Sequence, residues 1–147
     1  MHRKVFLLLF LVFFASQIKA QSKAEFGDLV LEISEFRNSE GHLLISLFNS
    51  QEDFPENKAG SFRVKKIKVS TLKEPIVFKD LPYGEYAVIF LHDENDNEKM
   101  DTNFVGIPQE GYGASNNAVN TFSAPKYNEA SLKVAQAITM QKLNIFY

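Results

Sequence analysis

The residues most able to do chemistry lie in one acidic, asparagine-rich run that follows His92. Counted from Asp93, side-chain oxygens fall at the first, third, fifth and ninth positions, and a backbone carbonyl falls at the seventh. This is the ligand spacing of an EF-hand-type loop, in which alternate residues of a tight turn point inward. Calcium suits such ligands because it takes about six to eight hard oxygens with tolerant geometry. The spacing therefore predicts a calcium site formed by Asp93, Asn95, Asn97, Lys99 and Asp101.

Two positions depart from that loop pattern. The sixth, which is usually glycine, is Glu98, and the twelfth, which is usually a bidentate glutamate, is Phe104. Glu110 could supply the missing carboxylate after a turn, so we include it in the predicted ligand set. The alternative is a solvated acidic turn without metal, since Asp and Asn are common in turns. The metal is favoured because five acids between Asp93 and Asp101 would repel one another without a counter-charge.

A competing interpretation is acid–base catalysis. An enzyme acting on envelope glycans or peptides would use His92, Asp93 and Glu110. No Ser or Cys nucleophile lies in a recognisable elbow, and a histidine that ends a strand is more often structural. Zinc is not expected, because the chain has no cysteine and no histidine pair at ligand spacing. We therefore expect a non-enzymatic binding or accessory module, with the enzyme and a passive, metal-free structural domain as alternatives.

Aromatic side chains lie in and near the segment that follows the acidic run, at Phe104, Tyr112, Phe122 and Tyr127. Exposed together, they would form a stacking surface for a sugar or a peptide. The alternative is that they anchor a loop onto the core. The residues that we predict to bind a ligand are Phe104, Tyr112, Asn116 and Asn117.

The elements that must position these residues are strands. Residues 28–36 alternate apolar and polar side chains, which is typical of a half-buried strand, and a turn at 38–41 leads into a returning strand over 42–48. The polar, Gly- and Asn-rich segment 93–120 lacks periodicity and is predicted to be one long loop. Further strands are predicted over residues 62–70, 75–79, 85–92, 131–134 and 137–146. About seven short strands separated by turns indicate an all-β sandwich.

Two side-chain patterns add detail to this sandwich. The lysines of residues 62–70 alternate with apolar residues, which is typical of a solvated face or an edge strand, where lysine discourages aggregation. Residues 49–61 are predicted to form a loop with Phe54 as its buried anchor.

The N-terminus has the order of an export signal. A basic pair, Arg3 and Lys4, precedes an apolar run over residues 5–15, and the segment ends in the small residue Ala20. This order predicts a cleaved signal peptide over residues 1–20. The run is too short for a membrane span, which needs about 20 apolar residues, so no span is expected after cleavage. We expect an exported protein, periplasmic or secreted.

Cleavage would leave one domain over residues 21–147 and would remove three cations, Arg3, Lys4 and Lys19. The formal net charge would then change from −2 to −5, because three positive charges and no acids are lost. A net-acidic chain argues against a nucleic-acid partner, since phosphate binding needs a positive surface. The chain has no cysteine, so its stability must come from a packed core, with help from a bound ion if one is present.

Three joined segments carry a family resemblance: residues 81–88 (Leu-Pro-Tyr-Gly-Glu-Tyr-Ala-Val), residues 92–103, and residues 106–117 (Gly-Ile-Pro-Gln-Glu-Gly-Tyr-Gly-Ala-Ser-Asn-Asn). Over about residues 27–147 the chain resembles the bacterial domain of unknown function 2141 family. That family often has glycine where this chain has Asp96 and Glu98. The resemblance implies a small exported protein with a prealbumin-like or carboxypeptidase-regulatory-like β-sandwich, and it implies no activity. The expected partner is an envelope protein or glycan.

Overall fold

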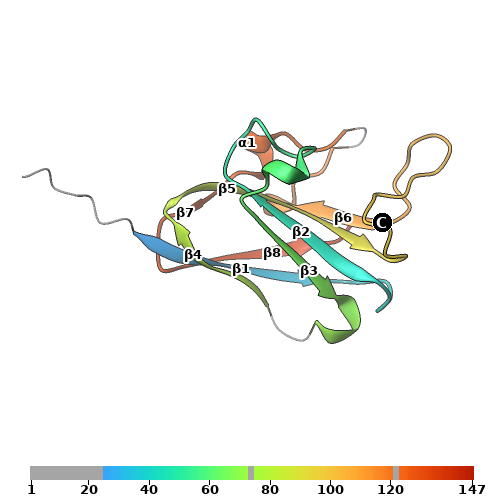
Figure 1. Cartoon of the computed structure of the whole chain (residues 1–147), viewed down its shortest axis with the longest axis horizontal. Coiled ribbons are helices and arrows are strands. Elements are labelled where there is room, and N and C mark those ends of the chain that lie inside the picture. The colour runs from blue at the N-terminus through green and yellow to red at the C-terminus, as the bar shows by residue number, and fades with distance from the viewer. Residues whose placement is uncertain (1–24, 73–74, 121–122) are drawn as a thin grey trace, which may run out of the picture.

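In the part of the chain that the structure describes, eight strands form two sheets that pack face to face (Figure 1). The computed structural model describes residues 25–72, 75–120 and 123–147. Its strands are β1 (Phe26–Ser34), β2 (His42–Phe48), β3 (Arg63–Lys68), β4 (Ile76–Pro82), β5 (Gly84–Asp93), β6 (Gly111–Ala114), β7 (Leu132–Val134) and β8 (Ile138–Asn144). The helical turns are η1 (Lys58–Gly60), η2 (Val69–Thr71), η3 (Ser115–Asn117) and α1 (Tyr127–Ala130).

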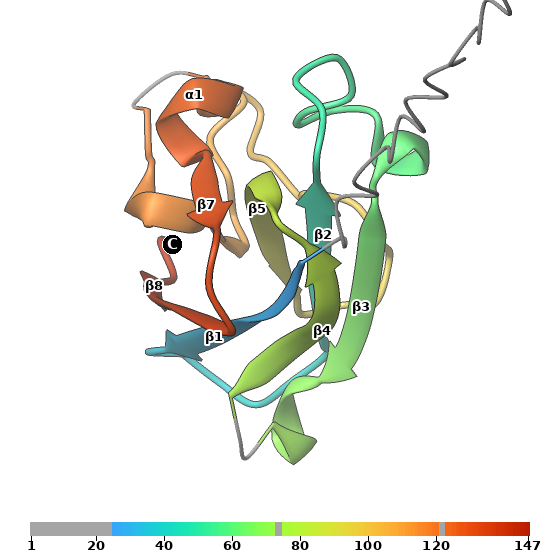
Figure 2. The ribbon, with the colours of Figure 1, turned by 90° about the vertical axis from the view of Figure 1, so that its left-hand side faces the viewer.

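The two sheets have different orders. The larger follows β3-β2-β5-β6 with antiparallel pairs, and β7 adds to the first residues of β5. The smaller follows β4-β1-β8, in which β1 pairs antiparallel with β4 and parallel with β8. In Figure 2, β1 and β8 of the smaller sheet lie below β2 and β5 of the larger sheet. The fold is thus the expected all-β sandwich of one domain.

The main core lies between the sheets because each strand alternates its side chains. Along β2, Leu43, Ile45 and Leu47 point inward and are at most 1 % exposed. They meet Leu29 and Leu31 of β1, which are fully buried in the same cluster. A smaller cluster forms on the outer face of the larger sheet, where loops cover it; it consists of Phe48, Phe54, Ala87, Ala114 and Ala130. Phe54 is therefore the buried anchor that the sequence predicts for the 49–61 loop.

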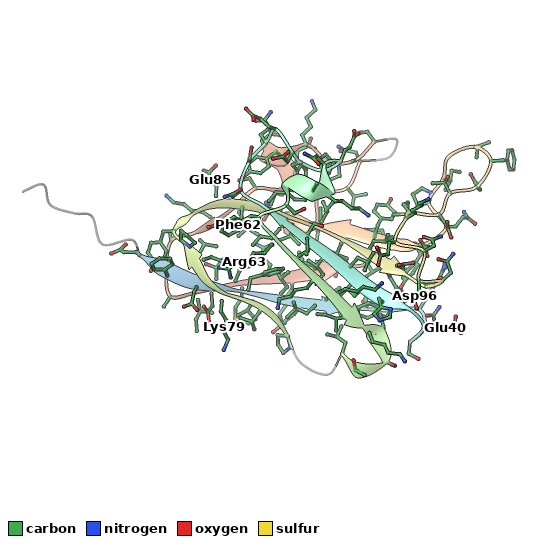
Figure 3. The ribbon with its side chains drawn as sticks, viewed as in Figure 1. Glu40, Phe62, Arg63, Lys79, Glu85 and Asp96 are labelled. Atoms are coloured by element: carbon green, nitrogen blue, oxygen red, sulfur yellow. The ribbon has the colours of Figure 1, made fainter. Side chains whose placement is uncertain are left out.

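Contacts close both open sides of the sandwich. On one side the Arg63 guanidinium of edge strand β3 donates to the backbone carbonyls of Lys79 and Asp80 of β4. Arg63 and Lys79 lie side by side in Figure 3. On the other side, beyond β8, Phe146 exchanges two backbone hydrogen bonds of 2.9 Å with Tyr112 of β6. β3 lies at the edge of the larger sheet, which confirms the prediction that its lysines belong to an edge strand.

The seven predicted strands are all present, with ends that differ by at most two or three residues. The exception to the prediction is β6, which lies inside the segment 93–120 that we expected to be one loop. The predicted signal peptide, residues 1–20, lies outside the described residues. Within the described part of the chain, no helix is long and apolar enough to cross a membrane.

Candidate functional site

The acidic run begins where β5 ends, and its first residue organises it. Asp93 is fully buried, and its carboxylate accepts hydrogen bonds from the backbone N–H groups of Asn97 and Glu98, both at 3.0 Å. Burying a carboxylate is costly unless hydrogen bonds or a cation compensate it. Asp93 therefore folds the following five residues into a tight loop around itself. This loop, residues 93–101, is called the acidic loop below.

Four side chains of the acidic loop, at the odd-numbered positions other than Lys99, lie toward one centre. The side-chain amides of Asn95 and Asn97 both donate to the Asp101 carboxylate, at 2.6 Å and 3.0 Å. The Asn95 side-chain oxygen accepts the backbone N–H of Asn97, and the Asn97 oxygen accepts that of Lys99. The structure thus brings the side chains of Asp93, Asn95, Asn97 and Asp101 together, as their spacing predicts.

The even-numbered acids point outward, and each meets a cationic or imidazole group from another part of the chain. Nε of Arg37 donates to Glu94 at 2.7 Å, and Lys66 donates to Glu98 at 2.7 Å. His42 contacts the Asp96 carboxylate, which lies at one end of the sandwich in Figure 3, far from Glu85. The hydrogen bond from Arg37 lowers the pKa of Glu94, and that from Lys66 lowers the pKa of Glu98.

The inward carboxylates, those of Asp93 and Asp101, differ from the outward ones in their lack of a cationic partner among the described residues. Among the described residues, no Lys, Arg or His side chain forms a salt bridge with Asp93 or Asp101. The described residues also contain no group of three or more His, Cys, Asp and Glu side chains placed to hold a metal ion. A cation in the acidic loop would therefore depend on the asparagine oxygens and on backbone carbonyls as well as on the two aspartates. That donor set consists of hard oxygens, which fits calcium.

Glu110 lies beneath the acidic loop and joins its two ends. It is 3 % exposed, and one carboxylate oxygen accepts the backbone N–H of Glu94 at 3.0 Å. The other oxygen accepts the backbone N–H of Asp101 at 3.1 Å. Both oxygens of Glu110 therefore already hold the backbone of the acidic loop.

The geometry of the site can be compared with known proteins. A model for the family described as "Uncharacterized protein conserved in bacteria (DUF2141)" matches residues 31–142. The chain belongs to the DUF2141 family. No curated protein and no solved structure matches it.

The acidic loop of this DUF2141 protein turns without glycine. Asp96 and Glu98 have φ angles of 60° and 61°, a left-handed conformation that glycine adopts more readily than other residues. These are the two positions at which the family resemblance implies glycine. The loop therefore makes the same turn with Asp96 and Glu98 in place of glycine. Contacts with His42 and Lys66 hold these two side chains on the outside of the loop.

Beyond the acidic loop, the DUF2141 chain forms a projecting hairpin over residues 102–109, which we call the finger (Figure 1). The Asn103 side-chain oxygen accepts the backbone N–H groups of Val105 and Ile107, at 3.0 Å and 2.9 Å. At its tip Phe104 is fully exposed, and Val105 and Ile107 are more than half exposed. The finger therefore presents apolar side chains on a hydrogen-bonded turn.

The other predicted ligand-binding residues have different surroundings. Tyr112 is half-buried, and its backbone pairs with Phe146. The Asn116 side-chain amide donates to the carbonyls of Glu129 and Ser131, and that of Asn117 donates to the carbonyl of Lys142. These two amides tie η3 to neighbouring segments, so Phe104 and Tyr112 are the better candidates for contact with a ligand. Tyr127 anchors its segment against the smaller core, and Phe122 lies outside the described residues.

His92 is a structural residue in this arrangement. It is fully buried, and its Nε2 lies 2.9 Å from the Glu40 carbonyl, which can only accept, so Nε2 carries the proton. Its Nδ1 accepts the Tyr147 hydroxyl at 2.8 Å, and that hydroxyl accepts the backbone N–H of Arg37. Both ring nitrogens are thus used by the protein, which leaves neither for a substrate. Sequence reasoning missed this network because Glu40, Arg37 and Tyr147 are distant from His92 in the chain.

Proposed function

We propose that this DUF2141 protein is an exported, non-enzymatic binding module whose acidic loop binds calcium. The bound ion would hold the adjoining finger in position, so that Phe104 and Tyr112 contact an envelope protein or glycan. One observation carries the proposal: each outward acid of the loop contacts a cationic or imidazole side chain, whereas among the described residues the inward carboxylates of Asp93 and Asp101 have no such partner and accept only neutral N–H donors.

The residues that would hold calcium are the side chains of Asp93, Asn95, Asn97 and Asp101 and the carbonyl of Lys99. Bound calcium would supply the positive charge that the two inward aspartates lack. The asparagine amides now donate to Asp101 in place of a cation. A half-turn of each amide would bring its oxygen toward the centre in place of its nitrogen, and would replace the hydrogen bonds that these oxygens accept from the backbone N–H groups of Asn97 and Lys99. Glu110 would act through the backbone, because both its oxygens accept N–H groups of the loop.

The finger depends on the acidic loop for its base. Asp101 is the last residue of the loop, and its carbonyl accepts the backbone N–H of Gln109 at 2.8 Å. The strand pairing of the finger continues directly from this bond, through the bridge between Thr102 and Pro108. An ion that fixes Asp101 would therefore also fix the base of the finger.

The enzymatic alternative has less support. A general base needs a free nitrogen or oxygen within reach of substrate. Both nitrogens of His92 and both oxygens of Glu110 are already hydrogen-bonded to the protein, and Asp93 is fully buried.

Calorimetric titration of calcium into the chelator-treated protein tests the proposal, together with thermal melts. We expect binding at millimolar calcium or tighter, and a melting temperature raised by several degrees, since calcium about a hundredfold above its Kd stabilises a fold by about 2.7 kcal/mol. The double variant Asp93→Ala/Asp101→Ala should lose both effects. Asp96→Ala is the matched control because it removes an outward acid of the same loop, and it should retain calcium binding.

Absence of both heat and a shift in the wild-type protein would refute the calcium site and favour the passive structural domain. Equal loss of binding in Asp96→Ala would show that calcium neutralises the loop as a whole rather than occupying its centre. Export is tested separately: the N-terminus of protein recovered from outside the cytoplasm should be Gln21, and retention of residues 1–20 in the cytoplasm would contradict it.

A further inference from the structure

The outer face of the larger sheet is covered at its two ends and open in its middle. At one end of β2 and β5, the paired residues Phe48 and Ala87 are buried in the smaller core. At the other end, His42 pairs with Asp93 under the acidic loop. Between these ends, two rows of outward side chains cross the sheet from β3 to β6. The register of the strands gives the rows as Val64–Ser46–Ile89–Ala114 and Lys66–Leu44–Leu91–Tyr112.

Apart from Ala114, which is buried in the smaller core, these two rows form the floor of a trough of about 1130 Å³. The finger and the end of the acidic loop make one wall, through Met100, Val105 and Ile107. Pro55 and Lys58 of the 49–61 segment also line the trough, and Lys58 reaches the acidic loop. Several apolar side chains of this trough are exposed, including Val64 at 65 % and Ile107 at 56 %. Exposed apolar surface that is concave and framed by polar residues is typical of a binding site.

The charged groups of the trough gather at its β3 end. Lys66 donates to the Glu98 carboxylate at 2.7 Å, and the ammonium group of Lys58 donates to the Glu98 carbonyl at 3.2 Å. Among the described residues that line the trough, Glu98 is the only acid, and its carboxylate pairs with Lys66 alone, since Lys58 donates to its backbone carbonyl. Lys65 also borders the trough, but its ammonium group lies 5.3 Å from the centroid of the Phe78 ring. The β3 end thus offers two ammonium groups, of which Lys66 also lies within the field of Asp96 and Asp93 of the acidic loop, while the ammonium group of Lys58 has no carboxylate partner among the described residues.

We propose that this trough binds a single-chain fatty acid, with its carboxylate at Lys58 and Lys66 and its alkyl chain along Leu44 and Leu91 toward Tyr112. The carboxylate would compete with Glu98, whose side chain is 65 % exposed and exchanges readily with solvent. The trough spans four strands, or about 14 Å at the usual strand spacing, which suits a medium-length alkyl chain.

The floor favours a fatty acid over the other occupants of similar charge. Its hydrogen-bonding groups are few, Ser46 and the Tyr112 hydroxyl among them, so an acidic peptide would bury backbone N–H and C=O groups without partners. The floor is two side chains wide along each strand, about 7 Å, which is narrow for the paired chains of a phospholipid. The proposal uses the trough alone and does not depend on calcium in the acidic loop.

Calorimetric titration of sodium dodecanoate, below its micelle concentration, into the purified domain tests the proposal. Dodecanol serves as the uncharged comparison. We expect dodecanoate to bind with one molecule per chain, and dodecanol to bind about tenfold more weakly because it lacks the charge. Shortening the acid to decanoate should weaken binding by up to about fifteenfold, since two fewer methylenes are buried.

Three variants locate the ligand. Lys58→Met/Lys66→Met keeps the aliphatic stems and should weaken dodecanoate about tenfold while leaving dodecanol unchanged. Ser46→Phe fills the floor and should weaken both ligands. Lys68→Met is the matched control, because Lys68 lies two residues after Lys66 on β3 and pairs with His42, outside the two rows of the floor. This variant should bind dodecanoate as the wild type does. A thermal melt of each variant shows that it is folded, and the lysine variants test the proposal even if Ser46→Phe does not fold.

The proposal is overturned if dodecanoate does not bind, or if dodecanoate and dodecanol bind equally well to the wild type. It is also overturned if the protein binds vesicles of phosphatidylglycerol or an acidic peptide but not dodecanoate. Titration in chelator, with the wild type and with Asp93→Ala/Asp101→Ala, separates this site from the acidic loop: binding of dodecanoate by both proteins supports the trough whatever the result of the calcium titration.

Discussion

At the scale of single residues, alternation along the acidic loop separates two kinds of carboxylate. Asp93, Asn95, Asn97 and Asp101 turn toward the centre, and the even-numbered acids turn toward Arg37, His42 and Lys66. The inward set was predictable, because ligand spacing is a local property of the chain. The outward partners were not, since each lies at least thirty residues away in sequence and reaches the loop only through the pairing of β2, β3 and β5.

The pair of Glu94 and Arg37 gives a prediction for pH dependence. The hydrogen bond from Arg37 lowers the pKa of Glu94 below its ordinary value of 4.5, so the folded protein holds this carboxylate ionised more strongly than the unfolded chain does. The pair therefore stabilises the fold above pH 4.5, and this stabilisation is lost as the pH falls through the lower, folded pKa. We expect Glu94→Gln to cost about 1 kcal/mol at pH 7 and progressively less in acid.

Thermal melts between about pH 3 and pH 7 check this expectation. The difference in melting temperature between wild type and Glu94→Gln should shrink as the pH falls. Glu56→Gln is the control, because Glu56 is exposed in the 49–61 segment, and it should change little at any pH. A difference for Glu94→Gln that stays constant with pH would mean that the variant acts through packing rather than through charge.

At the scale of elements, the finger and β6 are the parts that sequence reasoning could not place. β6 reads Gly-Tyr-Gly-Ala, which has little strand propensity, and its pairing with β5 is a tertiary effect. A Cβ on Gly113 would lie 2.3 Å from the Phe90 ring and 2.9 Å from the Asn144 carbonyl. Glycine is needed there because β6 packs closely between β5 and β8. That reason is visible only once the three strands are assembled.

Glu110, which immediately precedes β6, should control how firmly the acidic loop is held. Glu110→Gln keeps the shape of the side chain but replaces one acceptor oxygen with a donor nitrogen, so the backbone N–H of either Glu94 or Asp101 loses its partner. Leaving a buried donor unsatisfied costs about 1–3 kcal/mol. We expect a lower melting temperature, and faster hydrogen exchange at the amides of Glu94 and Asp101.

Hydrogen exchange followed residue by residue distinguishes this local effect from general destabilisation. The central amides of β1 should remain protected in Glu110→Gln to nearly the wild-type degree, apart from the global loss of stability. Unchanged exchange at Glu94 and Asp101 would contradict the view that Glu110 joins the two ends of the loop.

At the scale of the whole molecule, the sandwich was predictable and its topology was not. Period-two alternation marked seven strands, because each must bury one face. The parallel pairing of β1 with β8, and the closure of the two open sides by Arg63 and Phe146, join segments that are far apart in the chain. No local pattern specifies such partners. The likeness to prealbumin-like or carboxypeptidase-regulatory-like sandwiches stays a prediction.

The closed sandwich should unfold as one unit, and this gives a prediction that joins the core to the acidic loop. Leu29 is fully buried at the centre of the smaller sheet, between β4 and β8, so Leu29→Ala should cost about 2–5 kcal/mol. β5 contributes Val88 and Phe90 to the same core and ends in Asp93 of the loop. If core and loop unfold together, calcium should raise the melting temperature of wild type and Leu29→Ala by similar increments, because distant effects add. Calorimetric melts with calcium and with chelator measure both increments. A melt with two transitions, of which calcium shifts only the smaller, would show instead that the acidic loop and finger unfold separately from the sandwich.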